Sequence, residues 1–244
     1  MTSNKILIFI PTYNEAENVE RIHREVIGLG IEADILLLDD NSPDGTGEII
    51  DRIIEKNSNT FAIHREGKLG IGSAHKDGIK YAYEKDYELL VTMDCDFTHS
   101  PSYILEFIKL SERANIVLGS RYMQKDSLAT WNMFRKSLTH LGHFLTVNLL
   151  RMPYDASGAF RLYKLKAIQE GIFSLILSNG YSFFFESLFI LHCNKISIVE
   201  FPIELPSRTY GSSKMTFKDA WTSVQFLGKL FVRKLFNFKS LIWK

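Results

Sequence analysis

The chain of 244 residues is long enough for one large α/β domain or for a domain with an appendage. Its 45% hydrophobic and 23% charged residues are typical of a globular protein, and its net charge of +1 argues against a nucleic-acid binder that uses its whole surface. Two cysteines, Cys95 and Cys193, cannot build a disulfide framework, so we expect a reducing, cytoplasmic compartment.

No segment has the pattern of a signal peptide or of a membrane-spanning helix. Residues 1–5 lack the charged and apolar regions of a signal peptide. The most apolar long stretch, residues 171–193, is interrupted by serine, asparagine, glycine and glutamate, whereas a spanning helix needs about 20 predominantly apolar residues. We therefore expect a protein that is soluble or lies on a membrane surface.

The first half of the chain alternates apolar strands with amphipathic helices. In the first helical segment, Asn14 and Glu17 have the spacing of a capping box. The alternation predicts an α/β domain with a mostly parallel sheet that helices cover on both faces. The predicted strands are residues 5–10, 34–40, 60–65, 87–94 and 114–122, and the predicted helices are residues 11–26, 41–56, 70–85 and 100–112.

The pattern changes in the second half, where strands and helices no longer alternate. From there we predict a long amphipathic helix, a glycine-containing loop, a second helix and a late strand. These are residues 130–150, 154–164, 182–193 and 195–205, respectively.

The tail, residues 219–244, has apolar residues at helical spacing. Lys229, Arg233 and Lys234 fall on the other side of this predicted helix, and Asp219 is its only acidic residue. The apolar residues are Trp221, Val224, Leu227, Phe231, Leu235, Phe238 and Ile242.

Polar clusters follow four of the predicted strands. Ligands of parallel α/β sheets bind beyond the carboxyl ends of the strands, where the loops converge. We therefore expect the clusters to form one shared site. They are PTYNE at residues 11–15, DDNSPDGT at 39–46, DCDFTH at 94–99 and GSRY at 119–122.

Asp94 and Asp96 are the strongest candidates for a metal site. Two ionised carboxylates with one residue between them repel each other unless a cation lies nearby, and Mg²⁺ binds through one or two carboxylates together with substrate phosphates. A second interpretation is that Asp94 caps the next helix and Asp96 is solvated. Asp39 and Asp40 are equally ambiguous, because NSPDGT alone is a good turn and helix start.

Three other phosphate-handling motifs fit less well. Gly70-x-Gly72 has His75 at the third glycine position of the dinucleotide fingerprint and follows the third strand. No G-x-x-x-x-G-K-[ST] occurs, which excludes a P-loop. DCDFT resembles the nucleophile motif of haloacid-dehalogenase-type phosphatases, but that family has it on the first strand with an acidic pair downstream. Here it lies on the fourth strand, and the pair Asp39 and Asp40 precedes it.

Together the clusters resemble family-2 glycosyltransferases of the GT-A fold, and most of all the dolichol-phosphate and polyprenol-phosphate mannose synthases. The resemblance covers Ile6 to about Lys214 in the order of that family. It implies a GT-A catalytic domain over residues 1–215, a nucleotide-sugar donor with GDP-mannose as the leading candidate, and Mg²⁺ or Mn²⁺ as cofactor. The matching stretches are PTYNEAENV, LLLDDNSPDGT, REGKLGIGSAHKDGI, MDCDFTHSP, GSRY, YDASGAFRLY and RTYGSSK.

The same resemblance implies roles for individual donor-site residues. Asp94 and Asp96 should hold the metal on the donor diphosphate, and Arg121, Arg208 and Lys214 should close over the phosphates. A departing diphosphate accumulates negative charge, which a metal ion and Arg or Lys side chains stabilise where it develops. The full implied donor-binding set is Pro11, Tyr13, Glu15, Leu38, Asp40, Lys68, Asp94, Cys95, Asp96, Thr98, Arg121, Arg208 and Lys214.

A lipid monophosphate acceptor, also implied by the resemblance, explains why no catalytic base is obvious. Its second pKa is about 6, so it is largely a dianion near neutrality and its oxygen can attack the anomeric carbon directly. The family reaction inverts that centre and gives a β-linked polyprenyl phosphate sugar. Arg135 is the implied ligand of the acceptor phosphate, with Thr139 one helical turn later, and it joins Asp94, Asp96 and Arg121 in the implied catalytic set. FRKSLTH fits the solvated face of a helix equally well.

Residues 216–244 are predicted to form a basic amphipathic segment outside the catalytic domain. Such a helix can lie among lipid headgroups and would put the enzyme on the cytoplasmic face of a membrane. It also fits a helix packed on its own domain, an oligomer interface or a contact with a membrane-anchoring partner. Three other functions stay open: a same-fold transferase acting on a saccharide hydroxyl, a phosphatase, and a non-catalytic module that recruits partners.

Overall fold

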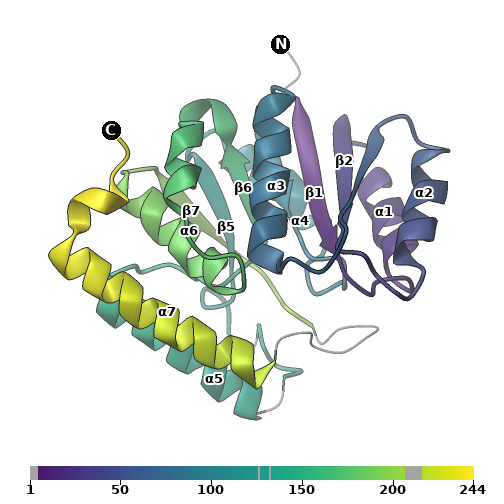
Figure 1. Ribbon diagram of the computed structural model, residues 1–244. Helices are drawn as coiled ribbons and strands as arrows, with labels where there is room; N and C mark the ends of the chain where they lie inside the picture. The colour runs from purple at the N-terminus through teal and green to yellow at the C-terminus, as the bar shows by residue number, and fades with distance from the viewer. Residues whose placement is uncertain (1–4, 126, 132, 207–215) are drawn as a thin grey trace.

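The computed structural model is an α/β domain built on one mixed sheet (Figure 1). It describes residues 5–125, 127–131, 133–206 and 216–244, with residues 134 and 135 described by their backbone alone. Within those ranges, seven strands are ordered β3-β2-β1-β4-β6-β5-β7, and only β6 runs antiparallel to its neighbours. The predicted mostly parallel α/β sheet is confirmed. The strands are β1 Ile6–Thr12, β2 Ala33–Asp39, β3 Thr60–His64, β4 Leu89–Thr92, β5 Ile116–Ser120, β6 Arg161–Lys164 and β7 Ile198–Pro202.

Helices cover both faces of this sheet (Figure 1). The α-helices are α1 Val19–Ile27, α2 Thr46–Ile54, α3 Ile71–Glu84, α4 Tyr103–Leu110, α5 Met133–Leu145, α6 Ser182–Cys193 and α7 Phe217–Phe236. A π-helical turn, η1 Thr146–Leu150, continues α5, and the 3₁₀ turns are η2 Leu165–Ala167, η3 Glu170–Leu175 and η4 Phe238–Leu241. No helix in the described ranges is both long and apolar enough to span a membrane.

The alternation of side chains along β1 supplies two apolar cores, one on each face of the sheet. Leu7 and Phe9 pack in the core that α3 and α6 close, whereas Ile8 and Ile10 pack in the core of α1, α2 and α4. All four side chains are fully buried. A strand that is buried on both faces needs apolar residues at every position, which explains the unbroken run at the start of the chain.

Two local predictions are wrong. Residues 154–164 were expected to be a loop, but Arg161–Lys164 form β6, which pairs with β4 and β5 through the middle of the sheet. Asn14 does not cap a helix, because α1 begins at Val19. Asn14 instead takes a left-handed backbone conformation with φ of 55°, in the turn that leads from β1 to the helix.

The tail helix α7 packs on the domain, but not with the predicted face. Leu227, which was expected beside Trp221, is only 5% exposed, whereas Trp221 is 58% exposed. Arg233 donates to the carbonyl oxygens of Leu175 and Ser240, and Lys234 donates to two carbonyls of η1. These two cations therefore face the protein and not the opposite side, where they were predicted. The helix has one apolar face toward the domain and another away from it.

Gly70 and Gly72 serve packing, which gives the Gly-x-Gly motif a structural role. A Cβ at Gly72 would lie 2.6 Å from the carbonyl oxygen of Gly180, so the start of α3 approaches the chain before α6 closely. Overpacking of this kind costs about 1–3 kcal/mol. We expect Gly72→Ala to lower the free energy of unfolding in urea by that amount. Gly228→Ala, in α7 with no atom within 4 Å of the added Cβ, should not lower it. Equal effects of the two changes would contradict this packing role.

His75 makes stability depend on pH. Its ring lies among Phe9, Phe183 and Phe184, and burial, with the nearby Arg161 and His99, lowers its pKa from 6.5 to about 3. In the unfolded chain, this imidazole therefore binds a proton near pH 6.5, whereas in the folded chain it binds one only near pH 3. Because of this one group, the free energy of unfolding should fall by up to about 1.4 kcal/mol per pH unit as pH drops through that window.

His75→Leu should remove this contribution. Urea unfolding between pH 7 and pH 4 should then show a shallower loss of stability than the wild type, by about that slope. His140→Gln removes an exposed histidine and is the matched control. Parallel pH profiles for wild type and His75→Leu would show that the imidazole is not held neutral.

Candidate functional site

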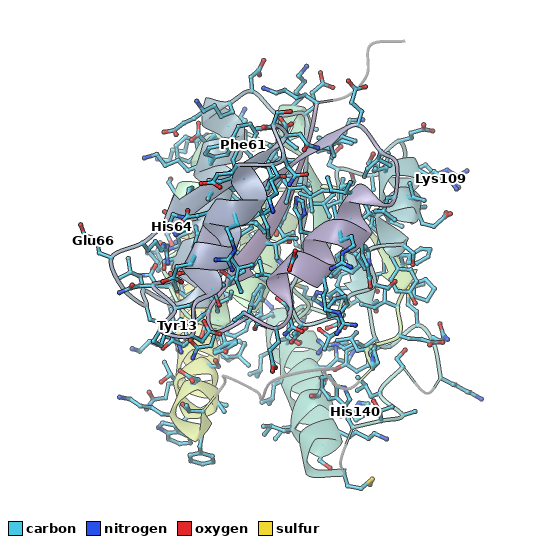
Figure 2. All side chains as sticks on the ribbon, turned by 90° about the vertical axis from the view of Figure 1, so that its right-hand side faces the viewer. Tyr13, Phe61, His64, Glu66, Lys109 and His140 are labelled. Carbon is cyan, nitrogen blue, oxygen red and sulfur yellow. The ribbon has the colours of Figure 1, made fainter. Side chains whose placement is uncertain are left out.

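The predicted polar clusters meet at one edge of the sheet. β1, β2, β4 and β5 all end there, and β6, being antiparallel, begins there. In the register of the sheet, Thr12 lies opposite Asp39 and Phe9 lies opposite Thr92, so the loops after β1, β2 and β4 leave side by side. Figure 2 shows Tyr13 at the lower end of the α/β layers, on the side from which α5 and α7 extend.

The acidic residues after β2 mainly hold the edge together. Asp39 is buried and accepts from the hydroxyl of Thr12 at 3.1 Å and from the backbone amide of Ser42 at 2.9 Å. Asp40 is buried against Arg65, with Nη1 2.7 Å from its Oδ1. Arg65 could not be predicted as a partner, because 25 residues separate the pair.

Hydrogen bonds join the loops after β1 and β2. The backbone amide of Glu15 donates to the hydroxyl of Thr46 at 2.9 Å, and its carboxylate accepts from Asn18 at 2.7 Å. Asp44 accepts from the amide of Ala16 at 3.1 Å. Burial alone would raise the pKa of Asp44, but hydrogen bonds from Thr46 and from this amide hold it below its usual value. The turn after β1 is therefore fixed before any ligand binds.

Two of the implied donor-binding residues come together above this edge. Lys68, from the loop before α3, lies over the ring of Tyr13 with Nζ 4.0 Å from the ring centroid. Pro11 and Leu38 lie within β1 and β2, and the Leu38 side chain is fully buried in the core. The cation is attracted to this aromatic face, so the two side chains hold each other in place.

The turn after β4 holds Asp96 rigidly. Its side chain is buried, and its Oδ1 accepts from the amide of Thr98 at 3.1 Å and from the Thr98 hydroxyl at 2.6 Å. Phe97 between them has φ of 61°, a left-handed conformation that tightens the turn. Cys95 packs in the core below. A solvated Asp96 is therefore wrong, and α4 has Ser102 rather than Asp94 at its N-cap.

Asp94 is the more open of the two carboxylates, with 35% of its side chain exposed. Its backbone amide donates to Nδ1 of His99 at 3.0 Å. His99 is buried and stacks on Phe160 with ring centroids 5.0 Å apart. This hydrogen bond and the ring stacking together hold the turn in place. His99 belongs to the DCDFTH motif, but no role was predicted for it.

Arg121 is held by Asp155, a residue for which no role was predicted. Its Nε lies 2.7 Å from Oδ2 of Asp155, its Nη2 bonds the other carboxylate oxygen, and its backbone amide donates to Oδ2 at 3.0 Å. Burial opposes both charges, but the pair holds the pKa of Asp155 below and that of Arg121 above the usual values. The negative charge of Asp94 also contributes to the raised pKa of Arg121. The only sign of Asp155 in the sequence was that an acidic residue lies inside the YDASGAFRLY stretch.

Arg161 fixes the loop that carries Asp155. Its guanidinium is fully buried and donates to the carbonyls of Ala156, Gly158 and Phe184 at 2.7–3.0 Å. Nη1 donates to Ser187 at 2.9 Å and to the Tyr163 hydroxyl at 3.3 Å, so every N–H of the side chain has an acceptor. The loop before β6 is thereby attached to α6.

The implied acceptor-side residues lie on α5. Arg135 is within α5, but its side chain is outside the described part. The carbonyl of Thr139 accepts from the Tyr122 hydroxyl at 3.1 Å, which attaches α5 to the strand end that carries Arg121. A cavity of about 280 Å³ between α5 and this strand end is lined by cationic residues, among them Arg121, Lys125 and Lys136, and by polar and apolar ones such as His140 and Leu128. Arg208 and Lys214 lie outside the described residues.

Asp94 and Asp96 fit a metal ion that the protein and a bound substrate hold together. Within the described ranges, no group of three or more His, Cys, Asp and Glu residues could hold an ion alone. Mg²⁺ typically takes one or two protein carboxylates and completes its shell with waters and substrate phosphates. Asp94 and Asp96 offer that number of carboxylates beside a cationic guanidinium.

Comparison with known proteins identifies the family. Residues 7–175 match the family model "Glycosyl transferase family 2". The chain is 30% identical over 213 residues to "Undecaprenyl-phosphate mannosyltransferase" of Micrococcus luteus, which covers 87% of this chain and 88% of that protein. It is 30% identical over 217 residues to "Polyprenol monophosphomannose synthase" of Mycolicibacterium smegmatis, which covers 88% of this chain and 82% of that protein.

The fold agrees with solved structures of nucleotide-sugar transferases. A mannosyltransferase from Pyrobaculum calidifontis, in complex with GDP-Man and Mn²⁺, superposes with a TM-score of 0.52 at 14% identity, over 86% of this chain and 59% of that one. At that identity the likeness concerns the fold. The chain belongs to glycosyl transferase family 2 and is a glycosyltransferase with a GT-A-type fold.

Proposed function

We propose that the protein moves mannose from GDP-mannose to a polyprenyl monophosphate, such as a dolichyl phosphate, with inversion at the anomeric carbon. The observation that carries the proposal is the 30% identity to two proteins whose names state a mannose transfer to, or mannose synthesis on, a polyprenyl phosphate, over more than four fifths of each chain. The geometry supports it, because two carboxylates, an arginine with a side chain only 9% exposed and a cavity lined in part by cationic residues meet at one sheet edge.

On the donor side, Asp94 and Asp96 would hold Mg²⁺ or Mn²⁺ against the diphosphate. The metal would supply charge neutralisation at the leaving group. Arg121 adds a fixed positive charge on the same side, and we assign Arg208 and Lys214 to the same task. Pro11, Tyr13, Glu15, Leu38, Asp40, Lys68, Cys95 and Thr98 complete the proposed donor site. The Pyrobaculum structure, which contains GDP-Man and Mn²⁺, supports this choice of donor and metal.

On the acceptor side, the phosphate needs positioning rather than deprotonation. A phosphomonoester is largely a dianion at neutral pH, so its oxygen can form the new bond to the anomeric carbon while the bond to the GDP diphosphate breaks. We assign Arg135 and Thr139 to the acceptor phosphate. The cationic residues that line the cavity between α5 and the strand end at Arg121 support that position, since their charge reduces the repulsion between two anions.

We also propose a division of the chain into a catalytic domain, residues 1–215, and a C-terminal helical segment, residues 216–244. The lipid nature of the acceptor places the enzyme against the cytoplasmic face of a membrane in this proposal. A membrane-anchoring partner or a second copy of the chain would be a further contact of the same segment.

Removal of a metal-site carboxylate should abolish transfer. With GDP-mannose, Mn²⁺ and labelled polyprenyl phosphate, we expect a lipid-linked mannose from the wild type and at least a 100-fold lower rate from Asp96→Asn. Asp51→Asn changes an exposed aspartate paired with His64 and should keep the wild-type rate. A panel of nucleotide sugars and a soluble saccharide acceptor accompany the assay. Transfer to the saccharide alone would contradict the lipid acceptor, and a normal rate for Asp96→Asn would contradict the metal site.

Asp155→Asn should weaken both the fold and catalysis, because it leaves Arg121 buried beside a neutral amide. Breaking a buried ion pair on one side costs about 3–5 kcal/mol in the free energy of unfolding. Among molecules that remain folded, kcat should fall more than the KM for GDP-mannose rises. Asp77→Asn removes an exposed carboxylate from Arg65 and should cost less than about 1 kcal/mol. Equal stability losses, or an unchanged kcat for Asp155→Asn, would contradict the role of the pair.

A further inference from the structure

Tyr122 and His143 form an aromatic stack between α5 and the strand end that carries Arg121. Tyr122 directly follows Arg121 in the chain, and His143 lies in the last turn of α5. Their ring centroids are 3.8 Å apart and their ring planes differ by 17°, so the two rings are in face-to-face contact. The stack therefore joins the acceptor side of the candidate site to its donor side.

Tyr122 makes further contacts with both sides. Its hydroxyl donates to the backbone carbonyl of Thr139 at 3.1 Å, one helical turn before His143. The guanidinium carbon of Arg121 lies 5.8 Å from the centroid of the Tyr122 ring, within the range of cation–π attraction. The Tyr122 side chain thus touches α5 at two points and the guanidinium at a third.

The chain around His143 is itself constrained. The Thr146 hydroxyl donates to the backbone carbonyl of His143 at 2.9 Å, and the π-helical turn η1 begins at Thr146. Such π-helical turns are frequent at functional sites. After η1, Arg151 takes a left-handed conformation with φ of 57°, and the chain continues into the loop that carries Asp155. Asp155, the ion-pair partner of Arg121, also acts electrostatically on His143.

His143 takes part in this contact as a neutral ring. Burial lowers its pKa below 6.5, the charge of Asp155 opposes this shift, and Arg121 and His140 add to it. A neutral ring does not compete with Arg121 for the Asp155 carboxylate. In the part of the chain that the structure describes, the buried Nδ1 of His143 has no hydrogen-bond partner. The contact therefore depends on the flat ring and not on that polar atom.

We propose that His143 is a positioning residue for the transfer: by stacking on Tyr122, it fixes the position of α5 relative to the Arg121 guanidinium. The inference rests on the proposed function, in which α5 holds the acceptor phosphate and Arg121 lies beside the donor diphosphate. The two reacting atoms need to approach within about 3–3.5 Å, and a misplacement of about 1 Å can lower the rate about 100-fold. His143 thus acts on the rate through geometry, without touching either substrate.

Kinetics of two His143 variants test this role. His143→Ala removes the stacked ring and should lower kcat at least about tenfold, because α5 can then shift relative to Arg121. The Kd for GDP-mannose with Mn²⁺, measured by titration calorimetry, should stay within about threefold of the wild-type value, since the donor-binding residues are unchanged. His143→Phe keeps a flat ring and should restore kcat to within about threefold of the wild type, because Nδ1 has no partner to lose.

The matched control is His23→Ala. It removes a buried histidine that lies between α1 and β3, where its Nε2 is 2.9 Å from the Thr60 hydroxyl, and it should keep the wild-type kcat. Thermal unfolding gives the folded fraction of each variant, and kcat is expressed per folded molecule. An equal loss of kcat in His23→Ala and His143→Ala would show a general effect of lost stability and overturn the proposal. So would a wild-type kcat in His143→Ala, or no recovery in His143→Phe.

A double-mutant cycle tests whether the two rings act as a unit. Tyr122→Leu removes the other ring of the stack. Combined with His143→Ala, it should lower kcat no further than the larger of the two single changes, because either change alone already breaks the contact. Losses that multiply in the double variant would show that the rings act independently and would contradict the proposal.

A failure of the proposed function gives a different result. If the wild type transfers to a soluble saccharide and not to polyprenyl phosphate, the lipid acceptor is wrong. The same comparison of kcat, made with that saccharide, then still decides whether His143 positions α5. If the wild type transfers to no acceptor, the proposed function and the role of His143 both fail.

Discussion

The buried guanidinium of Arg161 connects the loop before β6 to α6, and the site depends on that connection. It bonds carbonyls of the loop before β6 and of α6, so a cation inside the domain is matched by oriented dipoles on both sides. Losing any one of these acceptors would leave a buried donor unmatched, which is costly. The loop is therefore fixed, Asp155 within it is fixed, and Arg121 is held near Asp94 before any substrate arrives.

The carboxylates at the sheet edge have two different roles. Asp39 and Asp44 bond backbone and hydroxyl groups of the neighbouring turns, and Asp40 pairs with Arg65. These groups stabilise the edge as a rigid frame. The frame leaves Asp94, with 35% of its side chain exposed, close to the buried Asp96 in the turn after β4. Preorganised charges of this kind stabilise a leaving group without reorganising during the reaction.

Much of this could be predicted from the sequence, and the failures have physical causes. Long apolar runs predicted β1 and β2 because strands buried on both faces allow no polar position. The short strand at Arg161 was missed because four residues after a glycine carry too little periodicity. The roles of Asp155, Arg65 and His99 depend on contacts that folding creates, 34 residues apart in the first case. Helical spacing found α7 but could not separate its inner apolar face at Leu227 from its outer one at Trp221.

The most direct test of the account is the position of the metal in a crystal grown with GDP-mannose and Mn²⁺. Anomalous scattering at the manganese edge should give a peak bonded to the carboxylate of Asp94 or Asp96 and to diphosphate oxygens of the nucleotide. A bound nucleotide with its diphosphate away from these carboxylates, or a manganese peak elsewhere in the domain, would contradict the assignment of this sheet edge as the donor site.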